Sequence, residues 1–133
     1  MGQETEATKE FCEDAERRGA FTQVMAGALF QVGVPDRYIL SKAGRHTWLE
    51  FKHWTRVTLP DRIGWRPLFG SDKRAAQDEF VRAVYARDPQ GGAVCVAHPD
   101  PKRWALYVPT DRPDYVRGIT GRAAILQWVC HKD

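Results

Sequence analysis

The sequence lacks a long apolar run, and it has few cysteines and histidines. None of its hydrophobic stretches approaches the roughly 20 residues that span a membrane, and its polar, acidic N-terminus is unlike a signal peptide. The three cysteines are far apart and form no CxxC pair, and the four histidines are scattered. These absences argue against a membrane protein, a disulfide framework and a zinc site. We therefore expect a soluble cytoplasmic chain with its cysteines in or near the core.

Length and composition indicate one globular domain over residues 1–133. The usual prior is ~100–200 residues per domain, and 43% hydrophobic with 28% charged residues is far from a disordered composition. The net charge is only +3, but carboxylates crowd the first sixteen residues while basic side chains dominate the middle. These are Arg37, Lys42, Arg45, Lys52, His53, Arg56, Arg62, Arg66, Lys73 and Arg74. A basic middle suits a polyanionic substrate, although a charge run is more often only a solvated surface.

The N-terminal third predicts a helix followed by a strand. Apolar residues recur at four-residue steps within residues 3–18, at Ala7, Phe11 and Ala15. This spacing is typical of a helix with one buried face, and Gly19 is a natural end for it. Residues 20–31 are apolar and small, which favours a strand followed by a turn or loop.

Two short runs near the middle predict a β-hairpin. Pro35 pushes Val34 into an extended conformation, and residues 37–40 follow as a strand. A glycine-containing turn over 41–46 leads into a second strand at 47–52, which is rich in β-formers.

The remaining pattern completes a mixed α/β domain around a small sheet. Residues 53–71 contain two prolines and two glycines without a clear period, so they are predicted to form a long loop. A helix is expected from Ser71 to about Arg87. Strands are expected at 93–97 and 104–108, and a closing helix at 122–130.

The predicted hairpin contains the candidate catalytic residues. Side chains alternate along a strand, so Glu50 and Lys52 point the same way. A turn centred on Ala43 and Gly44 places Asp36 across from Phe51, beside Glu50 and Lys52. Two carboxylates and one ammonium would therefore converge at one end of the hairpin.

This cluster is suited to phosphodiester hydrolysis. Two carboxylates, with the backbone carbonyl of Phe51 as a neutral oxygen ligand, could hold Mg²⁺ or Mn²⁺. The metal would activate water, and Lys52 would position that water or offset negative charge. The plainer alternative is that Asp36 belongs to a turn and that Glu50 and Lys52 form a solvated ion pair.

The same segment resembles a known family. Residues 33–36 (Gly-Val-Pro-Asp) and 48–52 (Trp-Leu-Glu-Phe-Lys) are similar to the core of the PD-(D/E)xK nuclease superfamily. The later Gln77 and residues 91–96 are similar to its VRR-NUC branch. The resemblance covers about residues 4–97. It implies a restriction-endonuclease-like core, with a small mixed central sheet flanked by helices, and it leaves about 98–133 as a C-terminal addition.

The resemblance also implies roles for individual residues. Asp36 and Glu50 would be metal ligands, Lys52 the catalytic lysine, and Gln77 a residue that orients the site or contacts phosphate. The family carries a glutamate on its first helix, for which Glu4 fits best, with Glu10 and Glu13 as rivals.

The expected activity is that of a Mg²⁺- or Mn²⁺-dependent endonuclease acting on DNA, and the resemblance alone implies branched or structured forms of DNA. A homodimer would offer two sites to two strands. The candidate nucleic-acid contacts are Arg37, His53, Arg56, Lys73 and Arg74. Trp54 and Trp65 could stack on bases, or could only anchor their segment to the domain. The alternatives are a nucleic-acid-binding module without turnover and a hydrolase of RNA or another phosphoester.

Overall fold

The computed structural model describes residues 2–25, 35–55, 59–69, 75–111 and 113–131, with side chains from residue 6 and, in the third helix, from residue 76. The elements are α1 (Gly2–Arg17), β1 (Phe21–Val24), β2 (Arg37–Leu40), β3 (His46–His53), β4 (Arg62–Gly64), α2 (Trp65–Phe69), α3 (Ala75–Arg87), β5 (Gly92–Ala97), η2 (Pro101–Arg103), β6 (Ala105–Pro109), β7 (Asp114–Thr120) and α4 (Arg122–His131). None of the described helices combines the length and the apolar character needed to cross a membrane.

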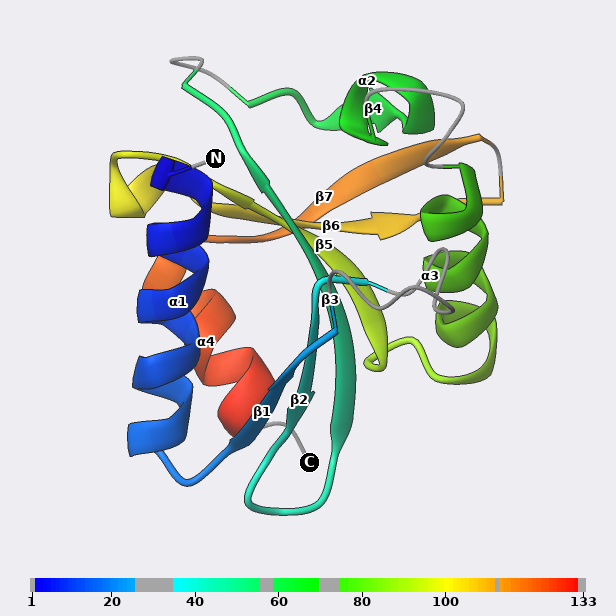
Figure 1. The fold of residues 1–133 in the computed structure, drawn as a ribbon. Coiled ribbons are helices and arrows are strands. Elements are labelled where there is room, and N and C mark those ends of the chain that lie inside the picture. Colours follow the sequence, from blue (N-terminus) through cyan, green and yellow to red (C-terminus); the bar gives the residue numbers. More distant parts are fainter. Residues whose placement is uncertain (1, 26–34, 56–58, 70–74, 112, 132–133) are drawn as a thin grey trace.

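The described strands form one mixed seven-stranded sheet in the order β1-β2-β3-β5-β6-β7-β4. The β3–β5 pair is parallel, and the other neighbouring pairs are antiparallel. Figure 1 shows α1 and α4 side by side on one face of the sheet, with α3 on the other. The architecture is therefore a sheet covered by helices on both faces, as the sequence predicts.

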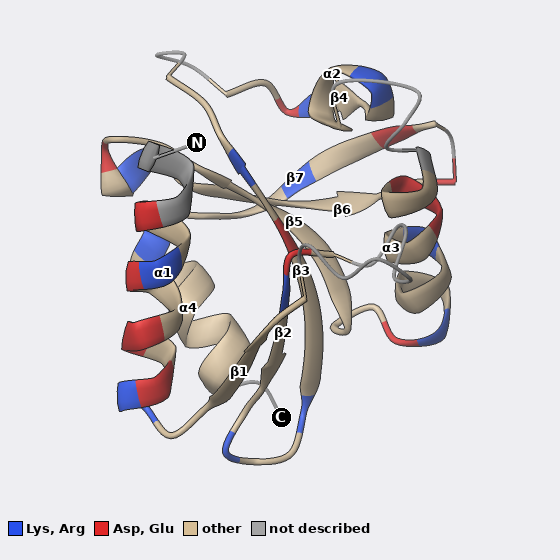
Figure 2. Ribbon diagram, viewed as in Figure 1, with Lys and Arg blue, Asp and Glu red and all other residues tan. Residues whose placement is uncertain are grey.

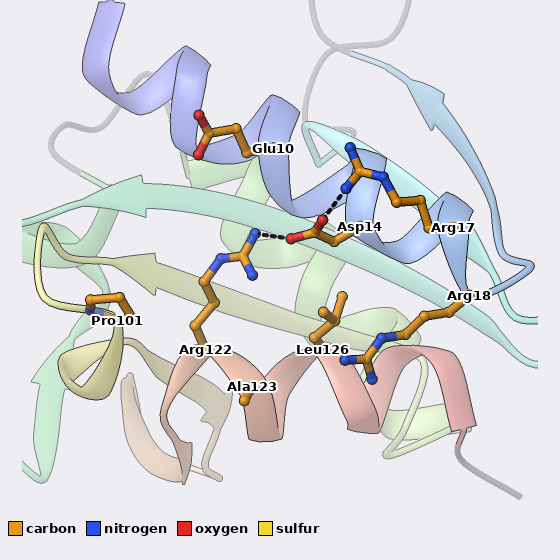
Figure 3. A pocket seen from close by; sticks show the side chains of 8 residues that line it. All are labelled: Glu10, Asp14, Arg17, Arg18, Pro101, Arg122, Ala123 and Leu126. Carbon is orange, nitrogen blue, oxygen red and sulfur yellow. Dashed lines mark hydrogen bonds and ion pairs between the residues drawn. The ribbon is translucent and has the colours of Figure 1, made fainter.

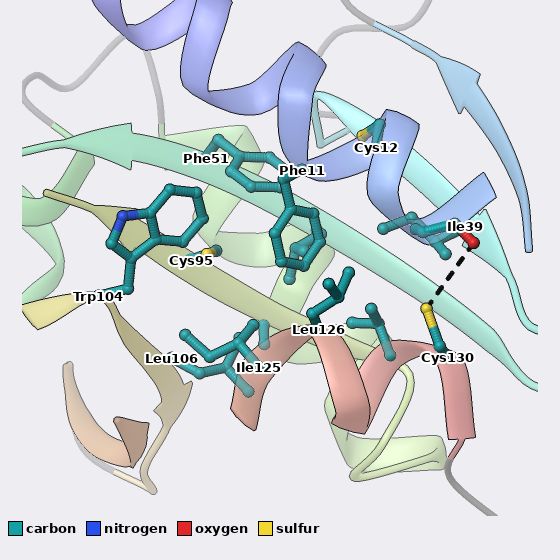
Figure 4. Close-up of a cluster of buried hydrophobic side chains, with 14 of the residues drawn as sticks. Phe11, Cys12, Ile39, Phe51, Cys95, Trp104, Leu106, Ile125, Leu126 and Cys130 are labelled. Carbon is teal, nitrogen blue, oxygen red and sulfur yellow. Dashed lines mark hydrogen bonds between the residues drawn. The ribbon is translucent and has the colours of Figure 1, made fainter. Parts of the chain in front are cut away.

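The α1–α4 face contains the first hydrophobic core. Phe11 of α1 is fully buried and lies edge-on to Phe51 of β3, with ring centroids 5.5 Å apart. It also stacks on Trp104, at a centroid distance of 5.7 Å (Figure 4). The expectation for the cysteines is confirmed, because Cys12, Cys95 and Cys130 are all buried and free.

The opposite face contains a second core beneath α2 and α3. Its buried members are Leu59, Ile63, Leu68, Phe69, Val81, Val94, Val96, Ala105, Tyr107 and Tyr115. The strand β5 contributes to both cores, and all six of its residues are buried, as expected of a continuous apolar run at the centre of a sheet.

The connection β3–α3–β5 fixes the direction of α3 relative to the sheet. Parallel strands need such a crossover, and the helix returns antiparallel to them. The first turn of α3 therefore lies toward the C-terminal ends of β3 and β5. The helix is also close to the sheet, because a Cβ added at Gly92 would lie 3.2 Å from the Val81 carbonyl oxygen.

Local signals for the ends of elements were reliable. The Ala20 N–H donates to the Ala15 carbonyl (3.1 Å) and the Gly19 N–H to the Glu16 carbonyl (2.9 Å). Gly19 has φ +95°, so α1 ends in a Schellman motif at the glycine that the sequence indicates. The strand at 37–40 and the closing helix are confirmed, and the 47–52 strand is one residue longer at each end.

One expectation is wrong, one strand was not predicted, and one expectation lies outside the described residues. The long loop predicted over 53–71 is wrong for residues 59–69, which contain β4 and α2. The strand β7 was not predicted, and it joins β6 to β4 within the sheet. The expected start of a helix at Ser71 lies outside the described residues, and α3 is described from Ala75.

Candidate active site

The sheet brings Asp36 and Glu50 directly together at the end of the β2–β3 hairpin. Arg37 pairs with Leu49 in the antiparallel ladder, so Asp36, one residue earlier, lies across from Glu50. The Asp36 N–H donates to Glu50 Oε1, and the Phe51 N–H donates to Asp36 Oδ2, both at 3.2 Å. Each carboxylate is thus held by the backbone of the other strand. In Figure 2 the red of acidic residues appears within the sheet where β2 and β3 lie side by side.

This register differs by one residue from the predicted one, in which Asp36 faced Phe51. The turn contains five residues and is centred on Ala43 alone: Ser41 N–H donates to the Arg45 carbonyl, and Gly44 has φ +89°. A slip of one residue reverses the face on which every side chain lies. The observed register puts Asp36 on the same face as Glu50, which the predicted register would not have done.

Lys52 completes the cluster on the same face. Its Nζ lies 3.3 Å from Glu50 Oε2, and its side chain is only 11% exposed. The ammonium also lies 5.4 Å from the centroid of the Phe69 ring in α2. The neighbours of Glu50 and Lys52 on β5 are Val94 and Val96, which belong to the core beneath α2 and α3. Glu50 and Lys52 therefore point toward that core and are screened from bulk solvent, while Asp36 is partly exposed.

The cluster has two carboxylates and only one ammonium, and burial makes this shortage of positive charge costly. The Glu50 side chain is 1% exposed, and this burial, with the neighbouring Asp36 carboxylate, raises the pKa of Glu50 from 4.5 to about 7. Lys52 lowers that pKa but does not restore it. A divalent cation would supply the missing charge, and hard oxygen donors match Mg²⁺ or Mn²⁺. The residues present therefore fit the metal that the sequence implies.

The backbone of Phe51 offers a further oxygen. In a strand, the N–H and C=O of one residue point to the same side. Because the Phe51 N–H donates to Asp36, its carbonyl lies on that same edge of β3, away from β5.

The protein's own ligand set is small. Within the described ranges no group of three or more Asp, Glu, His or Cys side chains could hold a metal. The candidate donors are thus two carboxylates and a carbonyl, a set that suits Mg²⁺ because this ion usually retains several waters. The side chain of Glu4, the fourth predicted ligand, lies outside what the structure describes. Its rivals Glu10 and Glu13 are exposed on α1.

Gln77 lies in the first described turns of α3, on the side that faces the sheet. One turn later Val81 is fully buried, and Phe80 contacts Trp48 of β3 at 5.3 Å between centroids. Because α3 runs antiparallel to β3, Gln77 is displaced from this contact toward the Glu50 end of the strand. Its buried Oε1 accepts no hydrogen bond in the structure. A buried amide oxygen without a donor is uncommon.

The structure describes two of the five predicted nucleic-acid contacts, Arg37 and His53. Arg37 is on the α1 face of the sheet, because it pairs with the buried Leu49 and its charge lowers the pKa of Cys12 against the larger effect of burial. His53 ends β3, and both of its ring nitrogens are buried without a hydrogen-bond partner in the structure. Arg56, Lys73 and Arg74 lie outside the described residues.

Some neighbours of the cluster were not identified from the sequence. Phe69 lies between Lys52 and Tyr115, whose ring centroid is 5.7 Å from that of Phe69. The Tyr115 hydroxyl donates to Asp78 Oδ1 at 2.7 Å, and Asp78 also pairs with Arg82 at 2.9 Å. No local signal marks these residues, because they come from α2, β7 and α3, far apart in the chain.

A pocket of about 640 Å³ lies elsewhere, between α1 and α4 (Figure 3). Its arginines are largely occupied, since Asp14 pairs with both Arg17 and Arg122. Arg122 also lies over the rings of Phe11 and Trp104. The pocket is on the opposite face of the sheet from Glu50, so it does not belong to the cluster.

The fold is a restriction-endonuclease-like mixed α/β fold. No protein-family model matches the sequence, and no curated protein is significantly similar to it. Among solved structures, the chain is similar to Hjc, a Holliday junction resolvase from the archaeal hyperthermophile Archaeoglobus fulgidus. The TM-score is 0.50 with 16% sequence identity, and the alignment covers 92% of each chain. The likeness thus covers most of the chain, more than the stretch of about residues 4–97 recognised in the sequence.

Proposed function

We propose that this chain is a Mg²⁺- or Mn²⁺-dependent endonuclease that hydrolyses DNA phosphodiester bonds, with branched or otherwise structured DNA as its substrate. The observation that carries the proposal is the pairing of Asp36 and Glu50, in which each carboxylate accepts a hydrogen bond from the backbone of the other strand. Lys52 Nζ lies 3.3 Å from Glu50 Oε2 beside them. The fold shared with a Holliday junction resolvase supports the choice of branched DNA. A cytoplasmic, single-domain nuclease of the VRR-NUC-like branch is part of the proposal.

In this mechanism Asp36, Glu50 and the Phe51 carbonyl would hold the metal. When bound, the metal would lower the pKa of a water and offset charge that develops on the phosphate. Lys52 is held between Glu50 and the Phe69 ring, so its ammonium is fixed where it can orient the attacking water. Gln77 would donate its amide to phosphate or water. Glu4 would contribute a further carboxylate from α1.

Burial explains why the cluster would be effective. Charges in a screened position interact more strongly than charges in water, and donors already in place need no reorganisation during the reaction. The cost is the ionisation of Glu50, whose pKa of about 7 reflects the uncompensated metal-free state.

A substrate panel tests the proposal. Labelled four-way junction, flap, duplex and single-stranded DNA and an RNA would each be incubated with Mg²⁺, Mn²⁺ or EDTA. We expect metal-dependent cleavage, strongest on junction or flap DNA, and its loss in Asp36→Asn. Cleavage of RNA alone would favour the ribonuclease alternative, and salt-sensitive DNA binding without any cleavage would favour a binding module.

A further inference from the structure

We propose that the depression formed by His53, Trp54, Thr55 and Pro67 binds one unstacked nucleobase next to the phosphate that is cut. This inference rests on the proposed function, because it takes the phosphate to lie at the cluster of Asp36, Glu50 and Lys52. It adds a means of selecting substrate by local unpairing.

The depression is adjacent to the cluster through two different elements. Just after β3, Trp54 lies two residues beyond Lys52 and packs against the core beneath α2 and α3, toward which Lys52 also points, whereas the side chain of the intervening His53 starts from the other face of the strand. On α2, Pro67 lines the depression, and Phe69, two residues later, lies against the Lys52 ammonium. A strand of nucleic acid with its phosphate at Lys52 would therefore present a neighbouring base to this depression.

The size of the depression favours a single ring system. Its volume is about 270 Å³, just below the roughly 300–1,000 Å³ of sites for drug-sized ligands. It has room for a base, whereas an intact base pair stacked in duplex would need far more.

The lining favours stacking over reading of base edges. Trp54 is partly buried against the core beneath α2 and α3, so its ring is held in place while part of it remains accessible. Pro67 adds an apolar surface. The ring nitrogens of His53 are buried, so they do not present hydrogen bonds to a ligand. Stacking on aromatic rings tolerates any base, so we expect little sequence preference from this contact.

The consequence is a preference for DNA that is already open. Extruding a base from intact duplex costs unstacking and unpairing free energy, and this cost is least where the base is already unpaired. Branch points and frayed ends have such bases. The depression would therefore favour branched over continuous duplex DNA without any contact to the branch itself.

A binding cycle tests this inference without relying on cleavage. The dissociation constant, Kd, of labelled flap and junction DNA is measured by fluorescence anisotropy in EDTA. Each nucleotide flanking the branch is replaced in turn by an abasic residue. Wild type is compared with Trp54→Ala, with Trp54→Phe, and with Trp128→Ala as the control. Trp128 is also a partly buried tryptophan, but it lies on α4 against the other core and does not line the depression.

We expect Trp54→Ala to weaken binding of intact DNA by about 5- to 150-fold, the range for loss of one stacked base. One abasic position should weaken binding to wild type similarly, and the two changes together should cost no more than either alone. Trp54→Phe should retain most of the affinity. Because this variant keeps an aromatic ring, it also separates lost stacking from a folding defect.

The inference would be overturned if the losses of affinity from Trp54→Ala and from the abasic residue multiplied at every abasic position. An equal loss of affinity in Trp128→Ala would also overturn it. The two proposals fail separately. If wild type cuts junction DNA and no abasic position is coupled to Trp54, the base site is wrong while the nuclease stands. If coupling is found but no DNA is cut, the base site stands and the proposed cleavage fails.

Discussion

We expect the metal-free protein to become more stable when Glu50, a proposed metal ligand, is replaced by a neutral residue. At 1% exposure, and beside Asp36, its carboxyl has a pKa of about 7 against an ordinary value of 4.5. Each pKa unit corresponds to about 1.4 kcal/mol, so ionised Glu50 costs the metal-free fold about 3 kcal/mol above pH 7. Glu50→Gln removes that cost and can keep the hydrogen bond from the Asp36 N–H.

The ammonium of Lys52 lies 3.3 Å from Glu50 Oε2, and its attraction is already included in the pKa of about 7. The loss of this ion pair in Glu50→Gln is therefore not a separate cost. We expect a gain of about 3 kcal/mol at pH 8, and for a domain of this size that corresponds to a rise in Tm of roughly 8–15 °C.

The pH dependence of this stability difference follows from the upward shift of the Glu50 pKa. Between pH 4.5 and 7 the native state binds a proton at Glu50 that the unfolded state has lost, so the stability contributed by this group falls as pH rises. The advantage of Glu50→Gln should therefore be absent near pH 4, grow through this window and level off above pH 7.

Thermal unfolding followed by circular dichroism, in EDTA at several pH values, measures this effect. Glu79→Gln, at an exposed position on α3, is the matched control and should show no such trend. Mn²⁺ should raise the Tm of wild type more than that of Glu50→Gln. A Glu50→Gln protein that is less stable than wild type at pH 8, or equally stable at every pH, would refute this account of the buried carboxylate.

Two further predictions concern the frame around the site and the sheet edge. Tyr115→Phe removes the 2.7 Å hydrogen bond to Asp78 and should cost about 1.5–3 kcal/mol in urea unfolding; a loss under 0.5 kcal/mol would mean that this contact is not made. The edge strand β1 exposes Phe21 (55%) and Val24 (53%) and carries no charge. An exposed, uncharged edge of this kind can pair with a strand of a second copy. If such pairing forms the homodimer, Val24→Lys should convert dimers to monomers in sedimentation velocity, whereas a monomeric wild type would contradict it.

Much of the local structure near the cluster could be predicted from the sequence. The α1 stripe and its glycine end are encoded in adjacent residues, as is the strand at 37–40. That Glu50 and Lys52 lie on one face of β3 follows from strand alternation alone. The predicted register is wrong by one residue because it centres the turn between Ala43 and Gly44. The hydrogen bonds inside the turn fix its centre at Ala43, and the sequence does not specify these bonds.

The parts that could not be predicted depend on distant contacts. The segment around β4 and α2 has prolines and glycines at loop-like spacing, and its order comes from burying Ile63, Leu68 and Phe69 in the second core. The strand β7 contains Arg117 and Gly118 and is only half-buried, so it lacks a strand-like alternation. The contact of Phe69 with Lys52 exists only after α2 docks.

The most direct test of the central claim is single-turnover cleavage of a labelled four-way junction in Mn²⁺ by wild type and Lys52→Ala. Lys102→Ala, at an exposed position in η2, serves as the charge-matched control. The account predicts cleavage by wild type and by the control, none in EDTA, and a loss of at least about 100-fold in Lys52→Ala, in line with removal of one preorganised donor. Cleavage that persists unchanged in Lys52→Ala would contradict the assignment of the active site.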